Sequence, residues 1–368
     1  MRDQTLLKKL RGRRIAIKST KCIGGVSMPD LELSETCEFS LAIEKEYGIA
    51  VREIKIVDEG SFLISTGCGI LSVKRIKDKE THIIYVTGLY DYIRERGFKN
   101  ILKIYRTKSG KYYMHCLNEI YIVSDCLDGA FKNFSFQGTE NKLFKLLALF
   151  HRASKGYAPP SGGKTKSNWG IWIEEYKKSL RNIKKHKEKL KANENKTPFE
   201  IMFLTSCDIY IDRMEECADI LKKGKYLDIV EESMRNREVC IGGFKQSNFY
   251  YTKEDISIVS LDKCKYDIRE WDIAKLLQKL LEYSTSRSAE SLSSLIYVYN
   301  EENPLLPDSI DIIKALVLFP GEYNEICLKH CLGKDKWTEG EYMNKLRSAM
   351  LMEDKKMNLI KTMESIKL

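Results

Sequence analysis

The side chains most suited to chemistry gather in one stretch of the chain, CIGGFKQSNFYYTKEDISIVSLDKCKYD, which runs from Cys240 to Asp267. It holds an amide at Asn248, an amine at Lys245, and carboxylates at Asp262 and Asp267. Mg²⁺ prefers oxygen ligands, carboxylates above all, and a lysine ammonium can contact a phosphate as a point charge. Residues of these types would suit the placement of charge around a phosphoryl group.

Two other groups of reactive residues do not assemble a recognisable site. Cys327, His330 and Cys331 fall on one helical face, but zinc needs about four ligands and no second pair accompanies them. We therefore expect a partly buried helix face there. His151, in LFHRAS, lies at a helix end, where an imidazole more often bridges backbone groups than performs catalysis. Hydrolase chemistry has no support, since no Ser, His and Asp grouping is recognisable.

The elements ahead of this stretch predict a small sheet with one helix. IAVREIKIV from Ile49, then SFLIST and GILSVKRI, are β-rich runs separated by turns at Gly60 and at 67–69, which predicts an antiparallel meander. A helix over about 80–96 should end at Gly97, because glycine suits the position just past a helix end. ILKIYRT and KYYMHCLNEIYIVSDCL predict two further strands.

The rest of the chain reads as mainly helical. Residues 139–155 carry apolar side chains at i, i+3, i+4 and i+7, which is typical of a helix with one buried face. Further helices are expected at about 168–193, 198–222, 225–236, 271–283, 286–299, 307–317 and from Tyr323 onward. We therefore expect a basic and polar N-terminal extension over 1–40, a sheet lobe over 41–126 and a helical lobe over 127–368.

In its order of parts the chain resembles kinase-like phosphotransferases, and at finer grain the CotS-type spore coat proteins, a family similar to aminoglycoside and choline kinases. The resemblance covers most of residues 45–365. Its segments are YIRERGFKNILKIYRTKSGKYYMHCLNEIYIVSDCLDG, LLALFHRASKGYAPP, CIGGFKQSNF, LDKCKYDIREWDIAKLL and NPLLPDSIDIIKALVLFPGEYNEICLKHCLGKDKW. It implies an α+β, bilobal protein-kinase-like fold, with a small antiparallel sheet lobe with one helix and a larger, mainly helical lobe.

Carried over position by position, the resemblance implies that no catalytic residue is intact. The His-Gly-Asp of an active catalytic loop falls on 241–243, so Ile241 stands at the histidine and Gly243 at the catalytic aspartate. Ser260 stands at the metal-binding aspartate of the following hairpin, and serine offers Mg²⁺ no carboxylate. Each such loss normally costs roughly 10² to 10⁴ in rate.

Other positions keep a suitable side chain. The resemblance places Lys74 at the third-strand phosphate lysine and Asn248 at a metal-binding asparagine, and Asp262 would share one side of a strand with the serine two residues before it. With Lys245, these residues would form a vestigial nucleotide site, with Asn248 and Asp262 as candidate metal ligands. The alternative for both lysines is simple solvent exposure. Asp272, in EWDIAKLL, matches an acid that braces the catalytic loop through backbone hydrogen bonds.

Composition limits the remaining classes of function. Lys plus Arg number 62 against 52 Asp plus Glu, but the excess of +10 is spread along the chain, which favours a solvated basic surface over nucleic-acid binding. No run of about 18 apolar residues predicts a membrane span, and no signal peptide is recognisable. Eleven scattered cysteines without a CxxC pair indicate free thiols in a reducing compartment.

The leading hypothesis is a catalytically inactive pseudokinase that serves as a structural or scaffold component of the endospore coat. It would be made in the mother-cell cytosol, assemble with other coat proteins and require no cofactor. One alternative is an ATP- and Mg²⁺-dependent small-molecule phosphotransferase that uses rearranged acids, for example Asp262 with Asp267. Another is a pseudokinase that binds a nucleotide without metal.

Overall fold

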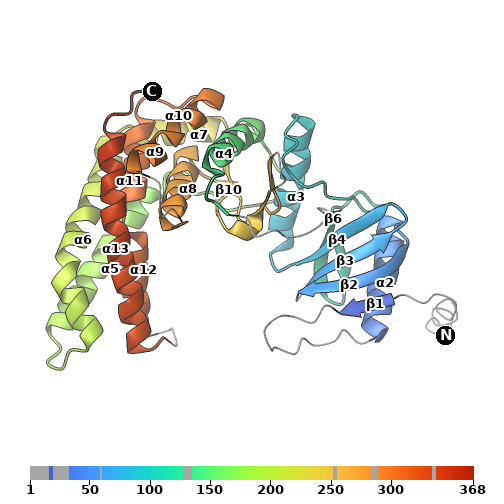
Figure 1. Cartoon of the computed structure of the whole chain (residues 1–368), viewed down its shortest axis with the longest axis horizontal. Helices are drawn as coiled ribbons and strands as arrows, with labels where there is room; N and C mark the ends of the chain where they lie inside the picture. Colours follow the sequence, from blue (N-terminus) through green and yellow to red (C-terminus); the bar gives the residue numbers. More distant parts are fainter. Residues whose placement is uncertain are drawn as a thin grey trace. The chain divides into compact units, whose positions relative to one another are not determined.

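The computed structural model describes residues 16–19, 33–58, 60–126, 135–251, 255–283, 288–333 and 337–368 (Figure 1). These residues divide into two compact units, and each is described by itself. The first unit comprises the described residues up to 91, together with 101–126 and 159–164. The second comprises 92–100, 135–158 and the described residues from 165 onward. Both units are therefore built from several chain segments, unlike the contiguous ranges expected from the sequence.

The first unit contains a six-stranded sheet in the order β1-β2-β3-β4-β6-β5. Its strands are β1 (Ala16–Ser19), β2 (Val51–Asp58), β3 (Ser61–Thr66), β4 (Gly69–Ile76), β5 (Met114–Cys116) and β6 (Glu119–Asp125). All neighbours are antiparallel except β1, which runs parallel to β2. The expected antiparallel meander is confirmed. The segment ILKIYRT is not a strand of its own and contributes isolated bridge positions at Ile101 and Ile104, the latter paired with Ser124.

Helix α2 (Leu33–Tyr47) supplies one side of this unit's core. Phe39 and Ile43 are buried and pack in one cluster with sheet residues such as Ile64 and Val73, which alternate with less buried positions along their strands. This helix begins inside the range 1–40 that was expected to be an extension, because its apolar side chains bury a face against the sheet. Helix α3 (Glu80–Glu95) follows β4, and Gly97 takes the left-handed φ of +84°.

The second unit is mainly helical, and its elements are listed here in chain order. They are α4 (Glu140–Ser154), α5 (Trp172–Lys191), α6 (Pro198–Lys223), α7 (Tyr226–Arg235), β7 (Val239–Cys240), η1 (Gln246–Asn248), β8 (Phe249–Tyr251), β9 (Ile256–Ile258), β10 (Lys265–Tyr266), α8 (Arg269–Tyr283), α9 (Ala289–Ser293), α10 (Leu295–Glu302), α11 (Ser309–Leu318), α12 (Gly321–Leu332) and α13 (Glu339–Met363). The expected helices are confirmed, with the range 286–299 divided between α9 and α10. Two short sheets, β7 with β10 and β8 with β9, interrupt the helices.

Local sequence signals explain where the long helices begin. Thr197 and Glu200 form a capping box ahead of α6, and Thr338 and Glu341 form another ahead of α13. Helices α5, α6, α12 and α13 then bury a common core around Phe199, Phe203 and neighbouring residues. Within the described residues, no helix combines the length and the apolar composition needed to cross a bilayer.

Candidate functional site

Strands β7 and β10 hold together the two ends of the stretch that the sequence singled out. Lys265 pairs with Cys240, so the loop 241–245, η1 and the β8–β9 hairpin lie between two paired strands. The Val259 amide donates to the Asn248 carbonyl at 2.8 Å, which places the asparagine beside the segment that holds the hairpin acid. Residues 252–254 lie outside the described part of this hairpin.

Asp272, in the first turn of α8, holds this loop by its backbone. Its Oδ2 accepts a hydrogen bond from the Ile241 amide at 2.6 Å, and its Oδ1 accepts one from the Gly242 amide at 3.2 Å. The side chain is fully buried, so these charge-assisted bonds form away from water. Such contacts are those required of an acid that braces the loop, the role that the resemblance implied for Asp272.

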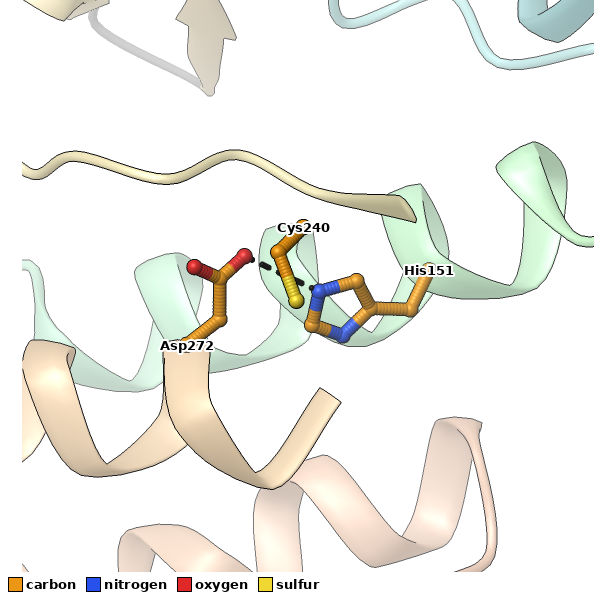
Figure 2. A group of neighbouring side chains, drawn as sticks. All are labelled: His151, Cys240 and Asp272. Atoms are coloured by element: carbon orange, nitrogen blue, oxygen red, sulfur yellow. Dashed lines mark hydrogen bonds and ion pairs between the residues drawn. The ribbon is translucent and has the colours of Figure 1, made fainter. Parts of the chain in front are cut away.

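His151 links this brace to the helical core. Figure 2 shows His151 from α4, Cys240 from β7 and Asp272 from α8 pointing toward one another. The His151 Nε2 lies 3.1 Å from Asp272 Oδ2, and its Nδ1 lies 2.8 Å from the Tyr299 hydroxyl. Both ring nitrogens are therefore engaged by side chains, and not by the backbone as was expected for this histidine.

The trio in Figure 2 suits neither nucleophilic catalysis nor metal binding, although its ligand atoms all lie within 4.8 Å of one another. Burial raises the pKa of the Cys240 thiol well above its usual value, and the thiol donates to the Ile268 carbonyl at 3.1 Å. A nucleophile or metal ligand needs the thiolate. His151 has no nitrogen left to deprotonate the thiol, so the trio acts as a structural connection.

The connection continues into a buried charged network that sequence reasoning did not find. The Asn303 amide donates to the Tyr299 hydroxyl at 3.0 Å and accepts from Arg269 at 3.0 Å. Arg269 lies 3.8 Å from both Glu238 and Glu270. Burial, with a further contribution from Glu270, raises the pKa of Glu238. A buried network of this kind fixes the packing of its elements, here β7, α8 and α10.

The two glycines at the centre of the loop differ in what their backbone requires. Gly242 has a φ of +79°, and a Cβ there would lie 2.0 Å from the Lys263 carbonyl oxygen, so only glycine fits. At Gly243 a Cβ would meet only the Lys263 side chain, at the ordinary contact distance of 3.7 Å. The position at which the resemblance places the catalytic aspartate therefore has room for a side chain, so steric constraints do not require a glycine there.

The candidate metal ligands form hydrogen bonds within the protein. The Asn248 side-chain amide donates to the Gly243 carbonyl at 3.2 Å, and the Ser260 hydroxyl donates to Asp262 Oδ1 at 2.8 Å. Asp262 is thus the one carboxylate among the three positions, and it already accepts a hydrogen bond. Nucleotide-bound Mg²⁺ is normally held by one or two carboxylates in near-ideal octahedral geometry. This donor set does not fit that ion well.

Asp267, the second acid of the rearranged-site hypothesis, is enclosed. It is 0% exposed, and it accepts hydrogen bonds from the Trp172 indole at 3.0 Å, the Asn168 amide at 3.2 Å and the Ile268 backbone at 2.9 Å. Burial is the main cause that raises its pKa to about 7. These donors direct its oxygens toward the protein interior, so the group is poorly placed to meet a substrate.

The two candidate lysines lie in different units. Lys74 is exposed on β4 of the first unit, and Lys245 is exposed on the loop of the second. Neither forms an ion pair with any residue that the structure describes. Glu80, at the start of α3, accepts a hydrogen bond from Tyr113 and forms no ion pair with Lys74 among the described residues. The second unit, which contains Lys245, also contains the remaining candidates. They are Ile241, Gly243, Asn248, Ser260, Asp262 and Asp272.

The cysteine and histidine face near the C-terminus packs into the core as expected. Cys327 is 1% exposed, and His330 on the same helix lies with its ring 4.2 Å from that of Phe199. All nine cysteines whose side chains the structure describes are free thiols.

A sheet unit followed by a mainly helical unit with this loop and hairpin defines a protein of the kinase-like phosphotransferase fold. The chain is similar to an aminoglycoside phosphotransferase from Alicyclobacillus acidocaldarius, with a TM-score of 0.73 and 16% identity over 93% of this chain and 98% of that one. It is also similar to a spectinomycin phosphotransferase, with a TM-score of 0.55 and 11% identity over 89% and 97% of the two chains. A third similar structure is that of a microcompartment-associated aminopropanol kinase, with a TM-score of 0.53 and 11% identity over 87% of this chain and 96% of that one.

The family of this chain is shown by a match to a protein-family model. The model of the family described as "Spore coat putative kinase YutH" matches residues 40–363, and the chain belongs to this family. The resemblance to spore coat proteins of the CotS type and the bilobal kinase-like fold are therefore both confirmed.

Proposed function

We propose that the protein is a structural component of the endospore coat that keeps the kinase-like fold without phosphoryl transfer. In this proposal it is made in the mother cell and assembles onto the coat through contacts with other coat proteins. Membership of the spore coat family supports the location. No nucleotide or metal is required, because the fold is held by its own buried contacts.

One observation carries the loss of activity. Gly243 stands where a catalytic base belongs, in a loop whose backbone Asp272 still fixes by two hydrogen bonds. The position is open to a side chain, so the geometry of the loop is kept while the group that accepts the substrate proton is missing. Loss of such a base, together with the serine at 260, removes several kcal/mol of transition-state stabilisation, about 10² to 10⁴ in rate for each.

Nucleotide turnover by the purified full-length chain tests this loss. With ATP and Mg²⁺, the unmodified protein should show no phosphorylation of sugars, amino alcohols or proteins above a no-enzyme control. The double variant Gly243→Asp with Ser260→Asp supplies both carboxylates and should raise nucleotide turnover if the rest of the site is competent. Turnover by the unmodified chain that disappears in Asp262→Asn would overturn the proposal in favour of a rearranged active site.

Thermal stabilisation by ATP tests the alternative in which the protein is a pseudokinase that binds a nucleotide without metal. The proposal expects ATP to raise the unfolding midpoint no more than an equal concentration of inorganic triphosphate does, in the presence of Mg²⁺ or of a chelator. A larger rise with ATP than with triphosphate, indifferent to the chelator, would instead identify a nucleotide-binding pseudokinase without metal.

A location experiment in a sporulating host tests the structural role. A fluorescent fusion should form a shell around the forespore, and deletion of the gene should change the protein composition of extracted coats. Asp262→Asn, which removes the carboxylate that a rearranged active site would need, should restore the normal composition, because no catalysis is involved. A fusion that stays diffuse in the mother cell would contradict a coat role.

A further inference from the structure

A cavity of about 460 Å³ opens beside Gly243 in the second unit, and its lining is unusual for its charge. One face of α8 forms a wall, with Trp271, Lys275, Gln278, Lys279 and Glu282 at helical spacing. The loop contributes Lys245, α12 contributes acids from its first turns, and α13 contributes Lys356. Its size falls in the range of small-molecule sites, about 300 to 1,000 Å³.

Most carboxylates of this α8 cavity are already neutralised by neighbouring cations. Glu282 pairs with Lys279, and Glu325 pairs with Lys329 at 3.0 Å. Glu322 is the remaining lining acid, and it is exposed at the cavity edge. The cavity lining therefore has more lysines without an ion-pair partner than carboxylates without one.

Two lysines carry that excess. Lys245 and Lys275 form no ion pair with any residue in the described part of the chain. A third, Lys356, is buried and lies 2.7 Å from Glu353, but that glutamate also accepts from Arg213 at 2.8 Å. One carboxylate thus faces two cations there, and the local charge of the cavity is positive.

Lys275 is held in place by the protein. Its Nζ donates to Gln278 Oε1 at 3.0 Å. The Gln278 amide nitrogen in turn donates to the carbonyls of Leu316 and Val317, at 3.2 and 2.9 Å, which fixes the direction of its oxygen. An ammonium has three donors, so two remain for a ligand. Its Nζ also lies 5.6 Å from the centre of the Trp271 ring.

The protonation of Lys275 agrees with this arrangement. Burial, and then the charge of Lys356, lower its pKa to about 8, while Glu322 and Glu282 oppose the shift. The amine is still largely charged at pH 7. A half-buried ammonium without a carboxylate partner is less well solvated than an exposed one, so an anion that joins it is favoured.

We propose that the α8 cavity binds a small phosphate- or carboxylate-bearing molecule on Lys245 and Lys275. The lining holds no arginine, which would favour planar, bidentate recognition, whereas lysines bind either anion as point charges. Trp271, Phe244 and Met352 supply apolar surface for the rest of such a ligand. This binding needs neither ATP nor catalysis, so it is independent of the proposed coat role.

Thermal unfolding of the full-length protein tests the proposal, with inorganic phosphate and citrate as probes and chloride as the reference at constant ionic strength. One or both probes should raise the unfolding midpoint in a saturable way, and the probe that acts identifies phosphate or carboxylate as the preferred group. Lys275→Gln and Lys245→Gln should each weaken the apparent affinity at least ten-fold. Lys222→Gln, a charge-matched change at an exposed lysine outside the cavity, should leave it unchanged.

Three outcomes would overturn the proposal. They are an equal rise in all variants, no rise with either anion, and a saturable rise with the cation spermidine alone. If Lys275→Gln fails to fold, Lys245→Gln decides, because the Lys245 side chain is exposed on the loop and its loss removes no packing. Quenching of tryptophan fluorescence by the bound probe, absent in Trp271→Phe, gives a second readout at the site itself.

Discussion

Gly242 and Gly243 are neighbours in the sequence but have different physical roles in the loop. The first has a backbone conformation that side chains rarely adopt and lies against a carbonyl oxygen, and the second has neither constraint. From sequence alone the two were distinguished only by the family resemblance. The structure separates a glycine required by the backbone from a glycine whose position has room for a side chain.

This difference predicts that the same substitution, glycine to alanine, destabilises the protein strongly at position 242 and weakly at position 243. Gly242→Ala should lower the free energy of unfolding by about 3 kcal/mol or more, since left-handed strain costs about 1 to 3 kcal/mol and the new Cβ also clashes with the Lys263 carbonyl. Gly243→Ala should change it by less than about 1 kcal/mol. Urea unfolding of the two variants measures both values. Equal losses would contradict the described loop geometry.

The bracing contacts show what sequence could and could not reach at the residue scale. Asp272 was identified from EWDIAKLL, because the motif places an acid in the first turn of a helix after the hairpin. Its partner His151 lies 121 positions earlier in the chain, and the same histidine contacts Tyr299, 148 positions after it. No local pattern encodes such distances, since they arise only when α4, α8 and α10 pack together.

At the scale of elements, periodicity located most of the structure. The helix expected over 139–155 is α4 (Glu140–Ser154), because its apolar spacing buries one face. The prediction of an independent strand at ILKIYRT was wrong, because a β-rich composition does not establish strand pairing. The α8 cavity was missed for a related reason. Two of its lysines, Lys275 and Lys279, lie one turn apart on α8, which in sequence is indistinguishable from an ordinary solvated helix face.

Helices α5 and α12 carry two histidines whose packing predicts sensitivity to acid. His186 is 3% exposed, and neither ring nitrogen has a hydrogen-bond partner in the described part of the chain. Burial, and then the proximity of His330, lower its pKa to about 4. The unfolded chain binds a proton near pH 6.5 and the folded chain does not, so stability is full above about pH 6.5 and falls as the pH drops toward 4.

Replacement of His186 should remove most of the loss of stability that occurs as the pH falls toward 4. Wild-type protein should lose about 3 kcal/mol of unfolding free energy between pH 7 and 4 from His186 alone, at about 1.4 kcal/mol for each unit of pKa shift. His186→Phe, which keeps a ring beside Phe203, should flatten the profile, and His115→Gln, at an exposed histidine of the first unit, should not. An unchanged profile in His186→Phe would contradict a buried, neutral imidazole.

At the scale of the whole molecule, the cysteines of both units follow one rule of burial. Cys116 in the first unit and Cys207, Cys217, Cys240, Cys264 and Cys327 in the second are buried, whereas Cys68 is exposed in the β3–β4 turn. Burial raises the pKa of each of these six thiols, Cys116 to about 11. Thiolate formation, and with it reactivity, is suppressed in the cores.

Thiol labelling of the native protein should therefore distinguish surface from core. With a disulfide-exchange reagent at pH 8, Cys68→Ser should remove one equivalent from the fast phase of labelling. Cys264→Ser should leave the fast phase unchanged and remove one equivalent only after unfolding in denaturant. Loss of fast labelling in the Cys264 variant would contradict its burial.

The braced loop around Gly243 also has a genetic consequence. Glycine and aspartate codons can differ by a single base, so one point mutation would place a carboxylate in a loop whose backbone already accommodates it. Serine and aspartate codons differ by at least two bases, so a carboxylate at position 260 requires more changes. If the resemblance places the proton acceptor at 243 and the metal ligand at 260, the first can arise by mutation more readily than the second, and relatives that carry an acid at position 243 alone are the intermediates to look for.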